Sequence, residues 1–543
     1  MKKYLAKNKW LIFALVVLSI FDTSVISGIP IITKYFIDYI PSLNTSLIIL
    51  FISLYIGDVL LILFFEYFVK IVSAKLYRNI SLAIKEDLFK KIFELPYKEF
   101  YKNDSDYYLN IFINDVEIVY ADYFDSLFCF ILSAIGLVVY SVCALFINYI
   151  VALVIIVSSL LTLIIPKLVG KKLSSKRKEQ SDSTQLYMAS LKDMLQGFTL
   201  HNKYTHKSFD GIHFFYNKNR EDKLYAFNKY KSFVNIFGGF SLYLVNIFTF
   251  TCGILLINAN MIALSSFVAV LSYVELIVSP SRDITYQIIG INSSKDIRRK
   301  IEGILNSHFE KEEYEIQDLQ KDIVFDNVSF SYDEENTVLD SISLKFELGK
   351  KYAIVGQSGT GKTTLVNLLL GRLTSTSGKV TYDGHDIEKV DVDKICANIN
   401  QNTFIFNTSA MNNITLFGSY NADNIDDLIK AIKAENILRD DIGEFGSKLS
   451  GGEKRKIDIL RNVVKKSKVF IGDEMFDSID KKSANEIKEF LNNEYKNSIW
   501  IEITHDISTD NLSRFDKILV TKNSHVSVLD CKTDNINEII NLL

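Results

Sequence analysis

The sequence predicts a chain of two parts, a polytopic α-helical membrane domain followed by an α/β domain with a largely parallel sheet. Long apolar runs crowd roughly the first 290 of the 543 residues, as helices that satisfy their own backbone in lipid require. From about residue 322, short strand-like segments alternate with helical stretches. We therefore place the membrane domain at 1–310, a linker at 311–321 and the α/β domain at 322–543.

The membrane domain is expected to contain six transmembrane helices. The candidate spans are about 11–33, 46–68, 124–147, 150–170, 234–257 and 262–283. They form three hairpins whose short connections lack Lys and Arg, whereas the other flanks are basic. By the positive-inside rule, both termini and the two long loops are cytoplasmic, and the chain is a multi-pass protein of the cell membrane. Because those loops show helical spacing of apolar residues, we expect helices that continue well past the bilayer.

The first twenty residues have the basic start and apolar body of a signal peptide. The apolar stretch continues through "VISGIPII" without a small-x-small cleavage site, so an uncleaved span is expected. The net charge of −3 gives no reason to expect a nucleic-acid partner. The five cysteines contain no C-x-x-C pair, which argues against a disulfide scaffold or a zinc site and favours a reducing compartment for the α/β part.

A glycine-rich segment in the α/β part fits the phosphate-binding pattern G-x-x-x-x-G-K-[ST] in full. It follows the strand-like "YAIV" and opens a helical stretch, as a P-loop requires. Its backbone N–H groups can wrap a β-phosphate, while the lysine reaches the β- and γ-phosphates and a threonine hydroxyl offers a ligand to Mg²⁺. The candidate nucleotide-binding residues are Gly356, Gln357, Ser358, Gly359, Thr360, Gly361, Lys362, Thr363 and Thr364.

Two neighbouring carboxylates, Asp473 and Glu474, follow the apolar run in "KVFIGDEMFDSID". Alone they would read equally well as exposed loop acids. Beside a P-loop, Asp473 at the strand end suits the metal, and Glu474 suits the attacking water. The segment "LSGGEKRK" precedes them and opens a helix, so Ser450, Gly451 and Gly452 predict a second anion site. A single chain therefore carries two phosphate sites. We expect the second site to bind a phosphate that a partner chain presents.

In this order the motifs resemble those of the ATP-binding cassette (ABC) transporters, and the likeness covers nearly the whole chain. "GQSGTGKT" resembles Walker A, "VFIGDE" Walker B and "LSGGE" the family signature. Four single residues also match family positions: Tyr332 the adenine-stacking aromatic, Gln401 the Q-loop, Asp480 the D-loop and His505 the switch histidine. "IGEFG", residues 442–446, resembles the loop that exporters place before the signature. Six spans before one cassette resemble the exporter-type half-transporters.

The resemblance implies ATP and Mg²⁺ as cofactors, with Thr363, Gln401 and Asp473 at the metal and Glu474 and His505 as catalytic residues. It also implies two chains in the bilayer that sandwich ATP between the Walker A of one and the signature of the other. We expect a homodimer, with a heterodimer as the alternative. Pro96–Lys102 and Tyr204–Phe209 match the segments that press on the cassettes in this family.

Three features depart from the family pattern. Gly472 stands where a hydrophobic residue is usual, which predicts a small packing loss without loss of activity. Glu453 replaces the commoner glutamine of the signature. The stretch from Gln401 to Leu449 is short, which predicts a trimmed helical subdomain.

The function expected is ATP-driven export of an amphipathic, cationic peptide or drug. Three acids within the spans, Asp22, Asp58 and Glu275, are the candidate substrate residues, because an intramembrane carboxylate is costly unless it faces water, a partner or cargo. Local hydrogen bonding or protonation of each acid is the competing interpretation. A lipid flippase and an exporter-shaped importer stay open, whereas a soluble ABC ATPase would lack the spans. A peptide exporter with its own leader peptidase is not expected, because the first cysteine is Cys129.

Overall fold

The computed structural model describes residues 1–42, 44–160, 165–307, 315–332, 336–420, 424–438 and 441–531. The chain divides into two compact units, Met1–Phe309 and Glu310–Leu543. The predicted linker, 311–321, overlaps residues 308–314, which lie outside the described residues. Its second half packs with the second unit: Ile316 bridges to Val390, Leu319 is buried, and the Asp383 carboxylate accepts hydrogen bonds from the backbone N–H of Gln320 and Lys321.

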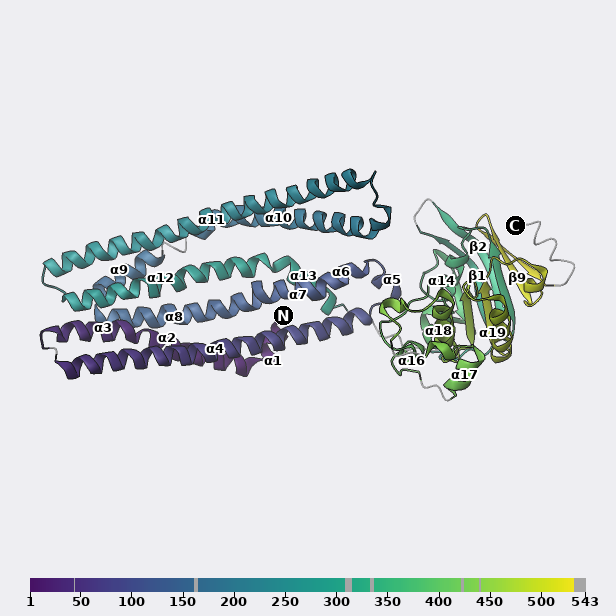
Figure 1. Ribbon diagram of the computed structural model, residues 1–543, viewed down its shortest axis with the longest axis horizontal. Helices are drawn as coiled ribbons and strands as arrows, with labels where there is room; N and C mark the ends of the chain where they lie inside the picture. Colours follow the sequence, from purple (N-terminus) through teal and green to yellow (C-terminus); the bar gives the residue numbers. More distant parts are fainter. Residues whose placement is uncertain are drawn as a thin grey trace. The chain divides into compact units, whose positions relative to one another are not determined.

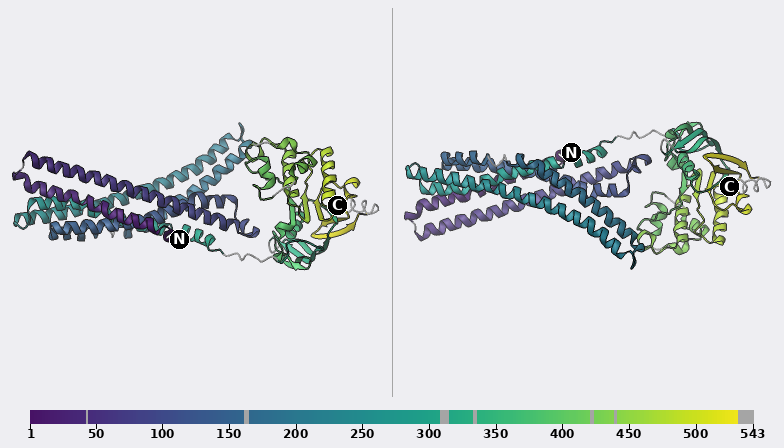
Figure 2. Two further views of the ribbon diagram at one scale, coloured as in Figure 1. Left: turned by 90° about the horizontal axis from the view of Figure 1, so that it is seen from below. Right: turned by 90° about the horizontal axis from the view of Figure 1, so that it is seen from above.

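The first unit is helical throughout its described residues (Figures 1 and 2). Its α-helices are α1 (Lys2–Lys7), α2 (Lys9–Ile26), α3 (Gly28–Tyr39), α4 (Thr45–Phe93), α5 (Tyr97–Phe100), α6 (Ser105–Asn110), α7 (Val116–Val119), α8 (Ser126–Ile147), α9 (Tyr149–Leu160), α10 (Ile165–Gln196), α11 (His206–Asn258), α12 (Leu264–Ser293) and α13 (Lys295–Leu305). Two π-helical segments, η2 (Ile111–Asp115) and η3 (Tyr120–Asp125), connect α6, α7 and α8 into one rod, and the 3₁₀ turns are η1 (Ile40–Ser42) and η5 (Gly197–Leu200).

Four described helical stretches are long and apolar enough to cross a membrane: Lys9–Ser42, Thr45–Phe93, Tyr107–Ile147 and Leu264–Asn292. They match the first, second, third and sixth predicted spans, although the last stretch begins at Leu264 rather than at 262. The fourth and fifth coincide with shorter apolar helices, Tyr149–Ser159 and Leu242–Asn258. The predicted fourth span also runs across 161–164, outside the described residues, so the count of six stays a prediction.

Helices much longer than a membrane span are present, as the helical spacing of apolar residues in the long loops predicted. α4 has 49 residues and α11 has 53, well beyond the roughly 20 that cross a hydrocarbon core. α10 and α11 lie side by side in Figures 1 and 2. Of the two segments that the resemblance assigned to cassette contact, Pro96–Lys102 contains the short helix α5 after α4, and Tyr204–Phe209 leads into the first turn of α11.

The first predicted span is broken at Ser27, between α2 and α3. The Tyr273 hydroxyl of α12, which is fully buried, donates to the Ser27 carbonyl at 2.6 Å. Gly28 opens α3, and a Cβ added there would lie 2.9 Å from Asp58 Oδ1 of α4. A side chain at Gly28 would therefore push the Asp58 carboxylate away, so three helices meet closely at this break.

The second unit contains two sheets and short helices. Its strands are β1 (Asp322–Ser331), β2 (Thr337–Glu347), β3 (Lys351–Gly356), β4 (Ser377–Tyr382), β5 (His385–Asp386), β6 (Cys396–Ile399), β7 (Val469–Asp473), β8 (Ile499–Ile503), β9 (Lys517–Lys522) and β10 (His525–Asp530). Its α-helices are α14 (Lys362–Leu369), α15 (Val392–Ile395), α16 (Ala410–Thr415), α17 (Ile425–Ala431), α18 (Gly451–Val463), α19 (Lys481–Glu494) and α20 (Thr509–Leu512), and its 3₁₀ turns are η6 (Ile387–Lys389), η7 (Glu435–Ile437) and η8 (Glu444–Gly446).

The larger sheet has the order β10-β9-β3-β8-β7-β6, in which every pairing except β9–β10 is parallel. The smaller sheet, β2-β1-β4-β5, is antiparallel, an element that the sequence did not separate from the parallel one. Buried apolar side chains pack on both faces of the parallel sheet, as parallel sheets require. The carboxyl ends of β3, β7 and β8 therefore meet at one edge, where ligands of such sheets bind.

Candidate functional site

The P-loop connects β3 to α14 at that edge. Gly359 and Gly361 have φ of +83° and +95°, a conformation that L side chains rarely adopt. A Cβ at Gly361 would lie 3.0 Å from Leu339 of β2, whereas a Cβ at Gly359 would meet nothing within 4 Å. The loop therefore packs against β2 on one side and has open space at Gly359 on the other. This open side, with exposed Thr363 in the first turn of α14, fits a nucleotide phosphate and its Mg²⁺.

Lys362 is buried, and its ammonium donates to two carbonyls of the loop itself, Gly356 at 2.8 Å and Gln357 at 2.9 Å. Burial lowers the pKa of Lys362, an effect that the nearby charges of Asp473 and Glu474 oppose. Thr360 closes the loop, since its hydroxyl donates to the Gln357 carbonyl and lies 2.7 Å from the hydroxyl of Thr521. Sequence reasoning did not find Thr521, which is buried on the neighbouring strand β9.

The structure brings Glu474, Gln401 and His505 together. The Gln401 side-chain amide donates to Glu474 Oε2 at 3.0 Å, and His505 Nε2 lies 2.7 Å from Glu474 Oε1. The three residues follow β7, β6 and β8, which are neighbours in the parallel sheet. Glu474 has φ of +48°, and its N–H bonds to the Ile503 carbonyl, so the backbone at β7 turns the carboxylate toward these partners. The group can hold a water against a phosphate and polarise it.

Asp473 ends β7 and is half-buried. Burial raises its pKa, and the charge of Glu474 raises it further, whereas Lys362 acts in the opposite direction. Gly472 precedes it, and a Cβ there would lie 2.1 Å from Met475 Cε. Met475 is fully buried, so its side chain fills the space that a larger residue at 472 would take. The packing loss predicted for Gly472 is therefore offset inside the same turn.

The signature segment caps α18. The Ser450 hydroxyl accepts from the Glu453 N–H at 3.3 Å, and the Glu453 carboxylate accepts from the Ser450 N–H at 2.7 Å. This reciprocal pair is a capping box, in which glutamate serves as well as glutamine. A Cβ at Gly452 would lie 2.7 Å from the Ser478 carbonyl, whereas at Gly451 the nearest atom is 3.6 Å away. A side chain at Gly452 would thus clash within the chain, whereas one at Gly451 would make ordinary van der Waals contact.

Two further residues matched by resemblance lie beside the P-loop helix and at the start of α19. Tyr332 is 64% exposed, and its hydroxyl lies 3.3 Å from Thr364 Oγ1, which places its ring beside the P-loop helix. Asp480 is the N-cap of α19 and accepts from the Ser483 N–H at 2.9 Å. That backbone hydrogen bond lowers the pKa of Asp480. Its first role in this chain is therefore to hold the segment after Ser478 in place.

Comparison with known families agrees with these motifs. Residues 12–281 match the model of the ABC transporter transmembrane region, and residues 339–477 match the ABC transporter model. The chain belongs to the ABC transporter family. Its domain order is that of an exporter-type half-transporter, with one membrane region before one cassette.

Curated relatives of the transporter include the ATP-dependent lipid A-core flippase of Psychrobacter cryohalolentis, 32% identical over 228 residues, which are 40% of this chain and 38% of that protein. ABC transporter B family member 13 of Arabidopsis thaliana is 30% identical over 255 residues, 44% of this chain and 19% of that protein. The chain spans about two fifths of the length of the flippases it matches. A solved structure described as a bacterial Atm1-family ABC exporter with ATP bound matches with a TM-score of 0.86 and 17% identity, over 99% of this chain and 98% of that one. At that identity the likeness shows the fold alone.

Sequence reasoning did not find Arg455, a buried charged residue of this transporter that contacts the backbone beside Gln401. Arg455, in α18, is 5% exposed and donates to the carbonyls of Asn400 and Gln401, each at 2.6 Å. A signal was present, since Arg455 and Asp458 are three residues apart in a helix whose other face is apolar. That spacing predicts a pair on one face but not what the pair contacts.

The three membrane acids differ in their surroundings. Asp22 Oδ1 and Asp58 Oδ2 are buried without a hydrogen-bond partner among the described residues, whereas Glu275 is exposed in this chain. Asp58 lies against Gly28, six residues beyond Asp22, or roughly 9 Å along a helix. Among described residues, no hydrogen bond or ion pair joins Glu275 to either aspartate. The role of these acids in substrate binding stays a prediction.

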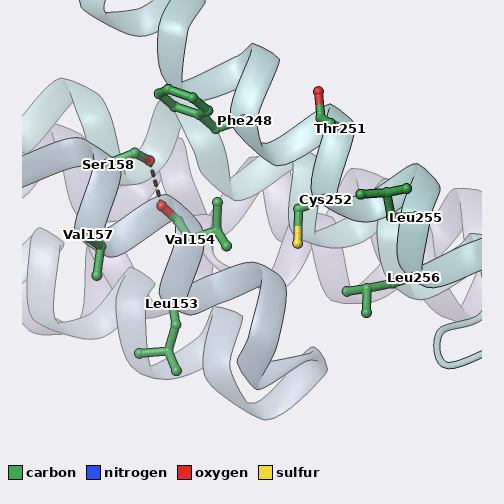
Figure 3. Close-up of a pocket in the computed structure, with 9 residues that line it drawn as sticks. All are labelled: Leu153, Val154, Val157, Ser158, Phe248, Thr251, Cys252, Leu255 and Leu256. Atoms are coloured by element: carbon green, nitrogen blue, oxygen red, sulfur yellow. Dashed lines mark hydrogen bonds between the residues drawn. The ribbon is translucent and has the colours of Figure 1, made fainter.

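A cavity of about 740 Å³ lies elsewhere in the membrane unit, between α9 and α11 (Figure 3). Its lining is apolar, with Leu153, Val157 and Phe248 among the side chains drawn, and Cys252 contributes its thiol. The one hydroxyl of α9 there, Ser158, donates to the Val154 carbonyl of its own helix. The cavity therefore offers hydrocarbon contact and no charge.

Proposed function

We propose that two copies of this chain form an exporter that couples ATP hydrolysis to movement of an amphipathic substrate out of the cytoplasm. The observation that carries the proposal is the placement of Glu474 between Gln401 and His505, beside the P-loop lysine. A carboxylate with two polar partners at the end of β7 is arranged to accept a proton from water. Every ATP motif of the chain is intact, which favours a homodimer with two working sites.

In this proposal Lys362 and the P-loop N–H groups bind the phosphates, and Tyr332 stacks on the adenine. Thr363, Gln401 and Asp473 hold Mg²⁺, which neutralises phosphate charge when it is bound. Glu474 orients and polarises the attacking water, and His505 keeps Glu474 in position. Ser450, Gly451 and the N–H groups that begin α18 complete the site of the other chain.

For the substrate we propose a cationic amphipathic peptide or drug, with Asp22, Asp58 and Glu275 as the acids that attract it. The two aspartates support this proposal because each has a buried oxygen with no hydrogen-bond partner in the part of the chain that the structure describes, and such groups are costly without a compensating charge. Glu275 is exposed on α12, where a second chain or the cargo can reach it.

A lipid substrate is the second candidate, and the uncharged cavity between α9 and α11 favours it. Relatives of this chain carry the name ATP-dependent lipid A-core flippase, which agrees with an acyl chain as cargo. An exporter-shaped importer differs from both in direction only.

Transport by purified protein in liposomes tests these alternatives. With the cassettes outside, export appears as ATP-dependent uptake into the lumen, whereas import appears as release. A fluorescent cationic peptide and a fluorescently labelled anionic lipid are assayed side by side, with Glu474→Gln protein as the matched control. Uptake of the peptide alone supports a cationic cargo, lipid movement alone supports the flippase, and ATP-driven release refutes the direction proposed.

A further inference from the structure

We infer that Arg455 is a positioning residue that sets the Q-loop, and through Gln401 the catalytic Glu474. The guanidinium of Arg455 donates hydrogen bonds to two successive backbone carbonyls. Nη1 donates to Asn400 and Nη2 to Gln401, both at 2.6 Å. The planar guanidinium fixes the directions of both hydrogen bonds relative to each other, whereas the donors of a lysine ammonium rotate on a flexible stem. The backbone of Gln401 is thereby held at the point from which its side chain reaches Glu474.

The buried carboxylate of Asp458 holds Arg455 in this position. Asp458 is 7% exposed and lies 3.8 Å from Arg455 Nη1. It also accepts from the Thr403 hydroxyl at 3.3 Å and from the Asn462 amide at 3.4 Å. A buried ion pair adds little net stability but leaves a costly unpaired charge when one partner is removed. Its main effect here is therefore to fix geometry.

The chain of contacts ends at the reacting group. Arg455 holds the Gln401 carbonyl, and the Gln401 amide donates to Glu474 Oε2 at 3.0 Å. Arg455 belongs to α18, the helix that begins at the signature residues Gly451 and Gly452. In the dimer proposed above, α18 therefore contacts two ATP sites. Arg455 contacts the site of its own chain, and the first turn of α18 contacts the site of the partner chain. This inference rests on the proposed roles of Gln401 and Glu474.

The chain offers a matched control in Arg461. It lies in the same helix, 3.8 Å from the other oxygen of Asp458. Its guanidinium also donates hydrogen bonds to the backbone carbonyls of Asn413 at 2.8 Å and Phe404 at 3.0 Å, but not to that of Gln401. Replacing either arginine removes a buried cation beside Asp458, so both sets of variants carry a similar folding penalty. Only the Arg455 variants release the Q-loop residue.

The experiment measures ATPase kinetics, Mg²⁺ dependence and melting temperature of the full-length protein in lipid nanodiscs. The variants are Arg455→Lys, Arg455→Gln, Arg461→Lys, Arg461→Gln, Gln401→Ala and the double variant Arg455→Gln/Gln401→Ala. For Arg455→Gln we expect kcat to fall about 10- to 100-fold, the cost of a misplacement near 1 Å, and half-maximal activity to need more Mg²⁺. The kcat of Arg455→Lys should fall less than that of Arg455→Gln. The kcat of the double variant should be no lower than that of the slower single variant.

The melting temperature of each Arg461 variant should fall as much as that of the matching Arg455 variant. Its kcat should change less than about threefold, within the range of context effects. If Gln401→Ala impairs turnover but Arg455→Gln behaves like Arg461→Gln, the positioning role is overturned and the proposed site stands. If Gln401→Ala leaves turnover and Mg²⁺ dependence unchanged, the proposed role of Gln401 fails, and the inference fails with it. Multiplicative losses in the double variant would also contradict it.

Discussion

His505 Nε2 lies 2.7 Å from Glu474 Oε1, although the two residues are 31 positions apart in the sequence. Because Gln401 holds the other oxygen, the carboxylate is bound on both sides by polar groups from neighbouring strands. A carboxylate held in this way presents its remaining lone pairs in a fixed direction, which a general base requires.

Glu474→Gln should therefore keep nucleotide binding and abolish turnover. The amide keeps the size of the side chain but cannot accept a proton, so we expect ATPase activity to fall at least about 100-fold. ATP titration monitored by fluorescence should give a Kd close to that of the parent. Glu435→Gln, at an exposed position, is the control and should hydrolyse ATP normally. Normal hydrolysis by the Glu474 variant would remove this residue from the catalytic role.

Gly451 and Gly452 should respond differently to substitution. Gly452→Ala forces a Cβ within 2.7 Å of the Ser478 carbonyl and should destabilise the protein by about 1–3 kcal/mol, seen as a lower melting temperature. A Cβ at Gly451 makes only ordinary van der Waals contact with Ser478 in its own chain, so Gly451→Asp should fold normally yet inactivate the partner's site by bulk and charge.

Mixed dimers test the composite site directly. Gly451→Asp in one chain and Lys362→Ala in the other should leave one site free of both defects, and activity should survive in this mixture alone. A separate assay must first show that dimers with one working site hydrolyse ATP. If ATPase activity is then lost equally in every mixture, each chain does not use the signature of its partner.

Asp58→Asn and Glu275→Gln should weaken stimulation of the ATPase by a transported cation, raising the concentration for half-maximal stimulation by about tenfold each, as loss of about 1.4 kcal/mol implies. Basal activity should be unchanged, because both residues lie in the membrane unit. Stimulation of the parent by labelled lipid only, with no response to cations, would instead favour the apolar cavity between α9 and α11.

Protein stability should fall as pH rises from about 5 to 7, because of Glu502. This residue is buried in β8, and burial raises its pKa from 4.5 to about 7. The folded state keeps a proton that the unfolded state releases between these values, so the free energy of unfolding falls by about 1.4 kcal/mol per pH unit and levels off above pH 7. Glu502→Gln should remove this slope in melting temperature, and exposed Glu486→Gln should retain it. If the melting temperature of Glu502→Gln depends on pH as that of the parent does, another group causes the pH dependence.

The sequence by itself determined the order of the domains and the parts of the ATP site. The apolar runs of the first half and the P-loop at Gly356–Thr364 depend on local composition and spacing, which fix helix length and the backbone approach to phosphate. Asp473 and Glu474 were found because they directly follow a buried strand. The break at Ser27 was not predicted, because Tyr273 and Asp58 reach it from other helices.

Only the tertiary structure decided which side chains act together. Glu474 meets Gln401 and His505 because β6, β7 and β8 are neighbours in the sheet, an order that no local pattern encodes. Met475 fills the space over Gly472, and Arg455 reaches the Q-loop across more than fifty residues. The membrane acids differ in burial, which their sequence spacing did not predict: Asp22 and Asp58 each have a buried carboxylate oxygen, whereas Glu275 is exposed in this chain. Contacts of this kind depend on packing between distant segments, so spacing along the chain does not specify them.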